Sequence, residues 1–370
     1  MRNSKEITVI VPKLPPSIDG IGDYGLRLAQ QLYQDLGWKT HFIVGTPEWQ
    51  GETEGEFFCV STVAARSQTA LLKLLPAAPA TVLLHYAGHG YANRGCPFWL
   101  VQALAQWCQS GGRLITLFHE LYATSPLLSS ALLTSPFQKR LATQVMELSD
   151  RVLTNQKQYA EKIDQLSHHK HSAIPTLPVF SNVGEIEQPL PLNQRSRRLI
   201  VFGGGGLRTA AYGRSRSALI KACTELDIEE IIDIGSPLKF QPEPIPDVAL
   251  KTLGVQPLTE ISRYMSSAIA GFLDYPTAYL GKSTIFAAYC SHGMIPIVSS
   301  KKTPNLDGLK SNQHYWLADS KQILDIEQAQ AIVHTAHAWY HAHNLRTQSA
   351  IFAASLGLEK NTSEIFPYKH

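Results

Sequence analysis

Two histidines that follow predicted strands are the residues in this sequence most suited to chemistry. His119 comes directly after an apolar run and precedes Glu120, and His85 ends another apolar run. Ligands of open parallel sheets bind beyond the carboxyl ends of the strands. An imidazole at that position can hydrogen-bond a substrate hydroxyl or stabilise a developing charge. We therefore expect His119 and Glu120 at a reacting centre. His85 and Asn93, from the glycine-rich segment that follows it, would line the substrate. The alternative is a histidine that only satisfies loop backbone.

A first glycine-rich loop opens a predicted helix with the spacing G-x-G-x-x-G, at Gly20, Gly22 and Gly25. Backbone amides at the start of a helix can approach a phosphate or a sugar. Residues 12–18, which contain three prolines, separate this motif from the preceding strand and make the loop too long for the tight turn of a dinucleotide site. We expect Gly20 and Gly22 to face a phosphate or a sugar, and a dinucleotide site or a plain turn are the alternatives.

A second glycine-rich loop, residues 203–206, follows the apolar run 199–202. Consecutive glycines allow close approach of the backbone to a ligand. Arg208 just beyond could hold a diphosphate through two parallel hydrogen bonds. The loop therefore predicts phosphate binding by Gly205, Gly206 and Arg208, with a flexible turn before a solvated basic helix as the alternative.

The segment Gly281-Lys-Ser-Thr284 precedes another predicted helix and resembles the end of a P-loop. The complete motif needs a glycine at position 276, where this chain has Pro276. A lysine and two hydroxyl groups at the start of a helix nevertheless suit an anion. We expect Lys282, Ser283 and Thr284 to bind a phosphate group without a Walker motif.

The sequence predicts neither a metal site nor a disulfide framework. The five cysteines are scattered, and none forms a C-x-x-C pair, so free thiols in a reducing compartment are expected. The cluster His168-His-Lys-His171 has no carboxylate or cysteine partner at helical spacing, which favours a solvated loop. There is no G-x-S-x-G nucleophile motif either.

Composition bounds the class of protein. The chain has 370 residues, a length typical of two domains. The net charge of +3 is too small to indicate a nucleic-acid partner, and it is compatible with loose attraction to an anionic membrane surface. The chain starts without a signal-peptide pattern, and no apolar run reaches the ~18 to 20 residues that a membrane helix needs. We expect a cytoplasmic protein.

The elements that must position these residues alternate between strands and helices. The predicted strands are short, continuously apolar runs, which is typical of parallel strands covered on both faces. They lie at 7–11, 40–44, 81–85, 114–118, 151–154, 199–202, 230–234, 268–273 and 295–298. Helices are predicted at 24–35, 97–109, 136–148, 217–226 and 284–291, with two more between 325 and 357. This alternation predicts doubly wound α/β units.

A polar, proline-bearing segment at 183–198 marks the boundary between two such units. We expect a first Rossmann-like domain at 1–190 and a second at 191–340. Residues 341–370 would hold a terminal helix.

In their order along the chain, these features resemble the family 4-like glycosyltransferases of the GT-B fold, over nearly the whole sequence. The resemblance rests on the first glycine loop, His119-Glu120, Asn182 at the linker and the glycines and arginine after residue 202. It implies two Rossmann-like domains that face each other across a cleft, with the last helix crossing back onto the first domain. It also implies that Gly20 and Gly22 face the donor diphosphate, that His119 lies near the donor sugar and that Arg208 binds the donor phosphates.

The sequence departs from that family at one motif. The family usually carries a Glu-x7-Glu pair that contacts the donor sugar and the ribose, and Leu280 and Ala288 stand at those positions here. A lysine such as Lys282 cannot replace a carboxylate that accepts hydrogen bonds from two hydroxyl groups.

We therefore expect a hexosyltransferase-type enzyme of glycan biosynthesis that uses a nucleotide-sugar donor, needs neither a metal nor another cofactor, and retains the configuration of the sugar, as the family implies. The acceptor, a glycan, lipid or small molecule, would lie on the first domain near Asp23, His85 and Asn93. No nucleic-acid partner is expected. The alternatives are an NAD(P)-dependent oxidoreductase, suggested by the first glycine loop, and a non-catalytic sugar- or nucleotide-binding protein, suggested by the missing glutamates.

Overall fold

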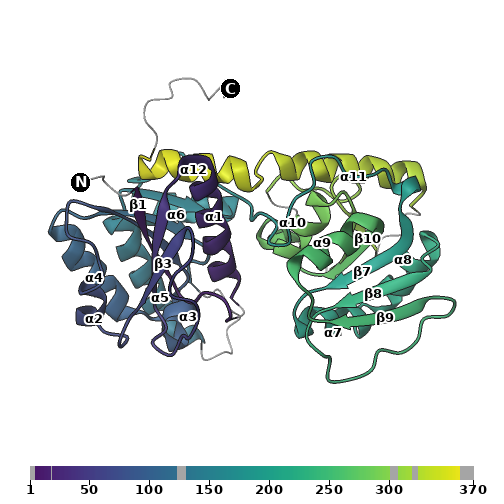
Figure 1. Ribbon diagram of the computed structural model, residues 1–370, viewed down its shortest axis with the longest axis horizontal. Helices are drawn as coiled ribbons and strands as arrows, with labels where there is room; N and C mark the ends of the chain where they lie inside the picture. Colours follow the sequence, from purple (N-terminus) through teal and green to yellow (C-terminus); the bar gives the residue numbers. More distant parts are fainter. Residues whose placement is uncertain (1–4, 18, 123–130, 301–306, 319–323, 359–370) are drawn as a thin grey trace. The chain divides into compact units, whose positions relative to one another are not determined.

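The computed structural model describes residues 5–17, 19–122, 131–300, 307–318 and 324–358. The chain divides into two compact units (Figure 1). Unit 1 combines Met1–Leu177 with Leu345–His370, and unit 2 is the continuous segment Pro178–Asn344. The divisions therefore fall at 177/178 and 344/345, where the sequence analysis expected 190/191 and 340/341.

Unit 1 is built on a six-stranded parallel sheet in the order β3-β2-β1-β4-β5-β6. The strands are β1 (Glu6–Val11), β2 (Lys39–Val44), β3 (Phe58–Thr62), β4 (Thr81–Tyr86), β5 (Arg113–Phe118) and β6 (Arg151–Thr154). All but β3 are buried along most of their length, because helices cover both faces of the sheet. The carboxyl ends of β1, β4 and β5 are neighbours at one edge of this sheet.

Two sets of helices cover this sheet. Figure 1 shows α1 (Gly20–Leu36) beside α12 (Leu345–Leu356), the segment that returns from the end of the chain. An apolar cluster of unit 1 joins strand residues such as Ile10, Leu84 and Leu114 to a second set of helices. That set is α2 (Gln68–Leu72), α4 (Phe98–Gln109), α5 (Ala131–Leu148) and α6 (Lys157–Leu166). A short helix, α3 (Gly88–Tyr91), and a 3-10 turn, Asn93–Gly95, follow β4.

Unit 2 repeats this plan with a six-stranded parallel sheet in the order β12-β11-β10-β7-β8-β9. Its strands are β7 (Ser196–Phe202), β8 (Glu230–Ile234), β9 (Ala249–Gly254), β10 (Ala268–Asp274), β11 (Ile295–Ser299) and β12 (Trp316–Leu317). Its helices are α7 (Gly205–Tyr212), α8 (Arg216–Glu225), α9 (Leu258–Ser267), α10 (Thr284–Ser291) and α11 (Ile326–His341). The 3-10 turn Thr277–Lys282 leads from β10 into α10.

The nine predicted strands are all present, and the sequence analysis missed β3, β9 and β12. The first two missed strands lie at sheet edges and are half-buried or exposed, so they lack the continuous apolar run used to find the others. Each predicted helix is also present: α10 has the predicted bounds, and the ends of the others are shifted. The helices α2, α3, α6, α7 and α9 were not predicted, and all of them have ten or fewer residues.

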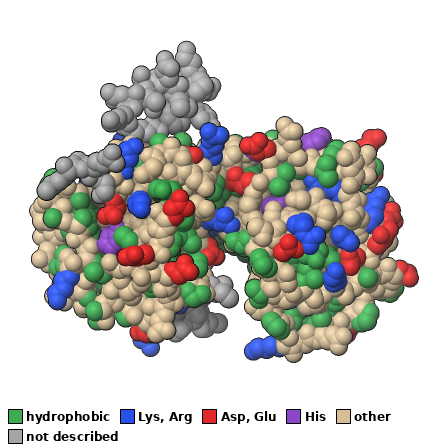
Figure 2. All heavy atoms as spheres, viewed as in Figure 1, with side chains coloured by type: hydrophobic (Ala, Val, Ile, Leu, Met, Phe, Trp, Pro, Cys, Tyr) green, Lys and Arg blue, Asp and Glu red, His purple; other side chains and the backbone are tan. Residues whose placement is uncertain are grey.

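The face that Figure 2 shows has no single-sign field of charge among its described residues. In Figure 2 acidic and basic side chains are interspersed over the visible face of each unit. Within the described ranges, none of the helices combines the length and the apolar character needed to cross a membrane.

Candidate functional site

His85 and His119 form a buried pair at the carboxyl edge of the unit 1 sheet. His85 lies in β4 and His119 directly follows β5, and the neighbouring pairing of these strands brings the two residues together. Their rings are stacked with centroids 5.2 Å apart, and His85 Nδ1 lies 3.0 Å from His119 Nε2. The ring of Tyr24, from the N-terminal part of α1, stands edge-on to both imidazoles. The sequence predicted both histidines but not this contact between them.

The surroundings of the pair keep His85 neutral. Its side chain is fully buried, and desolvation lowers the pKa of His85 to about 3. Its Nε2 has no hydrogen-bond partner among the described residues. Because His85 has no exposed surface, it cannot make the predicted contact with an acceptor, and it instead positions His119, whose residue is 7% exposed.

Three other residues that the sequence singled out in unit 1 lie nearer the solvent. Glu120 and Asn93 are exposed, and Asp23 is half-buried in the first turn of α1. Burial and the nearby charge of Asp19 raise the pKa of Asp23, against the opposing effect of Arg27. These groups remain available to hydrogen-bond sugar hydroxyls.

The start of α1 does not suit a phosphate. Asp19 caps this helix, and its carboxylate accepts hydrogen bonds from the amides of Ile21 and Gly22, each at 2.9 Å. A Cβ on Gly22 would lie 2.2 Å from the carbonyl oxygen of Lys13, so this glycine serves close packing of the preceding loop. With a carboxylate already on these amides, the structure argues against the predicted contact of Gly20 and Gly22 with a donor diphosphate.

In unit 2 the two glycine- and hydroxyl-bearing loops lie side by side. They follow β7 and β10, which pair in parallel. Gly203 approaches the first turn of α10 so closely that a Cβ on it would lie 2.4 Å from Ile285 Cδ1. Beyond it, Gly204, Gly205 and Gly206 face open space: apart from its chain neighbours and the backbone of its own helix, a Cβ built on any of them would have no described heavy atom within 4 Å. Gly204 has no side chain to cap α7, so the start of this helix can accept an anion.

The start of α10 carries the second predicted group. Ser283 is its N-cap, and the hydroxyl accepts a hydrogen bond from the amide of Phe286 at 3.2 Å. That hydroxyl is therefore engaged within the helix, and Ser283 is only 5% exposed. Lys282 and Thr284 on either side of it are half-buried. A ligand at this helix would meet Lys282, Thr284 and the backbone of the first turn.

Arg208 has a different partner from the one that the sequence predicted. Its guanidinium forms a two-pronged ion pair with the carboxylate of Asp233 in β8, and both side chains are 1% exposed. Tyr212 donates its hydroxyl to the same carboxylate at 2.9 Å, and burial together with Asp233 raises the pKa of Tyr212. Arg208 is thus a structural cation, and its Nη1 donates to the Ser236 carbonyl; Arg208 and Asp233 also belong to the lining of a cavity of about 470 Å³, together with residues 237–242 and Thr252.

A second ion pair at this edge leaves a cation in reach of solvent. Asp274, the last residue of β10, accepts hydrogen bonds from Arg214 and from Ser215, which is itself bonded to Ser299. Burial alone would raise the pKa of Asp274, but the hydrogen bonds from Arg214 and Ser215 and the charge of Arg214 outweigh it and lower that pKa. The side chain of Arg214 is 72% exposed, so it can meet a ligand as well.

The sequence analysis did not identify Asp233, a polar residue within strand β8, as the partner of Arg208. Asp233 interrupts an apolar strand, and a charged residue at such a position must find a buried partner, which was the available signal. The histidine cluster was described incompletely: His171 is buried and its Nε2 contacts the Met146 carbonyl at 2.8 Å. In the described part of the chain no three histidine, cysteine or acidic side chains come together as metal ligands would.

Comparisons of the sequence give no relatives. It matches no family model, and no curated protein matches it.

Comparison of the structure gives several neighbours. An apo structure of OtsA aligns with a TM-score of 0.60 and 10% identity over 97% of this chain and all (100%) of its own. An alpha-glucosyltransferase (AGT) in complex with UDP aligns with a TM-score of 0.59 and 9% identity over 95% of this chain and 98% of its own. A putative UDP-N-acetylglucosamine 2-epimerase from Listeria monocytogenes gives 0.59 and 12% identity over 98% and 99%. With two six-stranded parallel sheets in two Rossmann-like domains, the chain has the GT-B fold.

Proposed function

We propose that the protein is a glycosyltransferase that takes a sugar from a nucleoside diphosphate donor bound to unit 2. The observation that carries this proposal is the contact between Gly203 and Ile285, which brings the uncapped start of α7 beside the start of α10. Two helix N-termini at neighbouring strands form a site for a diphosphate. The solved structures named above, one of which contains UDP, support a uridine diphosphate donor.

A few residues of unit 2 would contact the two phosphate groups of the donor. The amides of Gly205 and Gly206 would approach one phosphate group, since the space beside them is open. Lys282, Thr284 and the first turn of α10 would hold the other, and Arg214 would add positive charge. These groups would stabilise the negative charge that develops on the leaving diphosphate, so the proposal needs no metal ion for that step. Arg208 enters only as the support of the α7 start, through Asp233.

The acceptor would bind on unit 1 at the edge that carries His119. Because His85 stays neutral, it can hold the His119 ring by a hydrogen bond without placing a second charge beside it. We propose that His119 positions the sugar at the reacting carbon, and that Glu120, Asp23 and Asn93 accept or donate hydrogen bonds to hydroxyl groups. Retention of the sugar's configuration and a role in glycan biosynthesis belong to the proposal through the family resemblance.

The structure bears differently on the two alternatives. A dinucleotide-dependent oxidoreductase would need a pyrophosphate at the start of α1, where the Asp19 carboxylate already holds the amides. A non-catalytic binding protein has one observation in its favour: Leu280 and Ala288, which the sequence analysis aligned with the glutamates of the resembled family, are apolar and only 1% and 0% exposed.

Donor binding and donor hydrolysis test the proposal separately. We expect UDP to bind in isothermal titration calorimetry and a nucleotide sugar from a UDP-hexose panel to be slowly hydrolysed without an acceptor. Gly206→Ala should leave the fold intact or more stable, because alanine favours a helix, and should weaken UDP binding by obstructing the backbone. A chain that binds UDP but hydrolyses no sugar nucleotide would be a binding protein. Absence of UDP binding would exclude the donor site.

A further inference from the structure

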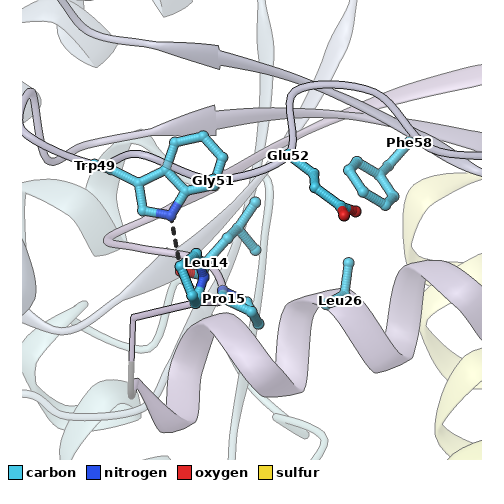
Figure 3. A pocket seen from close by; sticks show the side chains of 8 residues that line it. Leu14, Pro15, Leu26, Trp49, Gly51, Glu52 and Phe58 are labelled. Carbon is cyan, nitrogen blue, oxygen red and sulfur yellow. Dashed lines mark hydrogen bonds between the residues drawn. The ribbon is translucent and has the colours of Figure 1, made fainter.

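Unit 1 contains an apolar cavity of about 510 Å³ whose lining includes none of the proposed site residues. It is lined by Leu14, Pro15, Pro16, Leu26, Trp49, Gly51, Glu52 and Phe58. These come from the loop after β1, from α1, from the connection between β2 and β3, and from the start of β3. Figure 3 shows Trp49 and Phe58 on opposite sides of the space, with Leu26 below it. Its volume is in the range that holds a compact organic ligand.

The walls of this cavity are fixed by packing. Trp49 is 8% exposed and donates its indole Nε1–H to the Leu14 carbonyl at 2.8 Å, which joins the β1 loop to the β2 loop. Gly51 permits this arrangement, since a Cβ there would lie 2.3 Å from the Trp49 ring and 2.7 Å from the Pro15 carbonyl. Phe58 is braced edge-on by Phe42 and by Phe57. The cavity is therefore preformed.

Glu52 supplies the charge in this lining. Its carboxylate extends between Phe58 and Leu26 in Figure 3. Within the described residues no hydrogen bond or ion pair engages the Glu52 side chain. Glu54 and Glu56 are also exposed, but they do not belong to the lining. An anionic group beside aromatic faces favours a cation, because both the carboxylate and the ring electrons attract positive charge.

We infer that this cavity binds a small molecule with an aromatic or alicyclic body and a protonated amine. The body would lie between Trp49 and Phe58, and the amine would face Glu52. An anionic ligand does not fit, because Glu52 is the charged residue of this lining. If the proposed glycosyl transfer is correct, this ligand is the acceptor or part of it, and that role rests on the proposed function, whereas the binding does not.

A charge series of probes with one common body tests the inference. We would titrate the chain with 2-(1-naphthyl)ethylamine, 2-(1-naphthyl)ethanol and 1-naphthylacetate, without donor, by isothermal titration calorimetry. The amine should bind most tightly and the carboxylate least. Glu52→Gln should weaken the amine about fivefold, the effect of losing an exposed ion pair, and leave the alcohol unchanged. Glu54→Gln, two residues away and outside the lining, is the matched control.

Steric blocking separates the cavity from surface adhesion. Leu26→Trp should fill the space and abolish binding of all probes, while Gln34→Trp, at an exposed position of the same helix, should not. Equal binding of the three probes, or binding that survives Leu26→Trp, would overturn the inference. UDP titration of each variant keeps the two proposals apart: retained UDP binding with no amine binding refutes only the cavity's role, and amine binding without UDP binding refutes only the donor site.

Discussion

Nδ1 of His85 and Nε2 of His119 lie 3.0 Å apart, and the two residues belong to neighbouring strand ends rather than to one loop. Since desolvation lowers the pKa of His85 to about 3, the inner ring is neutral at all physiological pH values. One nitrogen of the pair must donate to the other. The contact therefore constrains the tautomer and the orientation of the His119 ring.

Buried histidines make the stability of the protein pH-dependent. Burial lowers the pKa of His85 to about 3 and those of His292 and His343 to about 4, against about 6.5 in an unfolded chain. The unfolded chain therefore binds more protons below pH ~6.5, so folding stability falls as the pH falls from there toward 4. Each such histidine contributes up to about 1.4 kcal/mol per pH unit.

Urea unfolding at pH 7.5 and 5.5 measures this slope. His85→Gln should reduce the change of unfolding free energy with pH by the contribution of about one proton. His89→Gln, at an exposed histidine, should leave that change unaltered. A slope that His85→Gln does not alter would mean that His85 is charged in the folded state.

The ion pair of Arg208 and Asp233 should affect folding more than ligand binding. Arg208→Met leaves a buried carboxylate without its cation and should destabilise the chain by about 3 to 5 kcal/mol. Arg208→Met with Asp233→Leu removes both charges and should recover most of that loss. Urea unfolding of the single and double variants checks this. A stable Arg208→Met chain that no longer binds UDP would restore Arg208 as a phosphate ligand.

Adjacent glycines provide a matched test of the contact between the unit 2 loops. Gly203 has a φ of +125° and touches Ile285, so Gly203→Ala should cost about 1 to 3 kcal/mol and reduce UDP binding. Gly204→Ala is the control, because its φ of −63° suits alanine and its surroundings are open. Thermal unfolding and UDP titration of both variants decide the point. Equal behaviour of the two would show that the contact is unimportant.

Lys282 should matter through its charge. Lys282→Ala is expected to weaken UDP binding by about 1.5 to 3 kcal/mol, the value of a charged hydrogen bond. Lys251→Ala removes an exposed cation from β9 of the same unit and should have little effect. Calorimetric titration at 50 and 300 mM salt would also reveal whether both substitutions act only through general charge, which would contradict a specific phosphate contact.

Tyr24 and Gln348 connect α1 to α12 by a buried hydrogen bond between the Tyr24 hydroxyl and Gln348 Oε1. Tyr24→Phe leaves the fully buried amide with one partner fewer and should cost about 1 to 3 kcal/mol, although the ring contacts remain. A double-mutant cycle with Gln348→Met measures the coupling, which we expect near 1 kcal/mol. Additive effects would show that the bond contributes nothing.

Buried parallel strands were predictable here because both of their faces must be apolar. Apolar runs such as 81–85 and 114–118 therefore showed where strands end, and so placed His85 and His119 at the carboxyl ends of the sheet. The edge strand β9 escaped because four of its residues are exposed. Loop glycines were found by type, yet their roles depend on distant partners: Gly203 on Ile285, and Gly22 on the Lys13 carbonyl. Tyr24 and Gln348 lie 324 residues apart, and no local pattern joins them.

The return of α12 to unit 1 also affects how the chain can fold. Residues from Leu345 onward complete the surroundings of Tyr24, and a ribosome makes them only after all of Pro178–Asn344. Unit 2 is one continuous segment, so its contacts can form before α12 has been synthesised. At that stage the face of α1 that later packs against Gln348 and Phe352 is still exposed. The contacts that complete unit 1 join residues on either side of unit 2 in the sequence. Contacts between residues so far apart in the chain form slowly. During synthesis, the first part of the chain to emerge is thus the last to be completed, and its uncovered apolar face is the natural target for a chaperone.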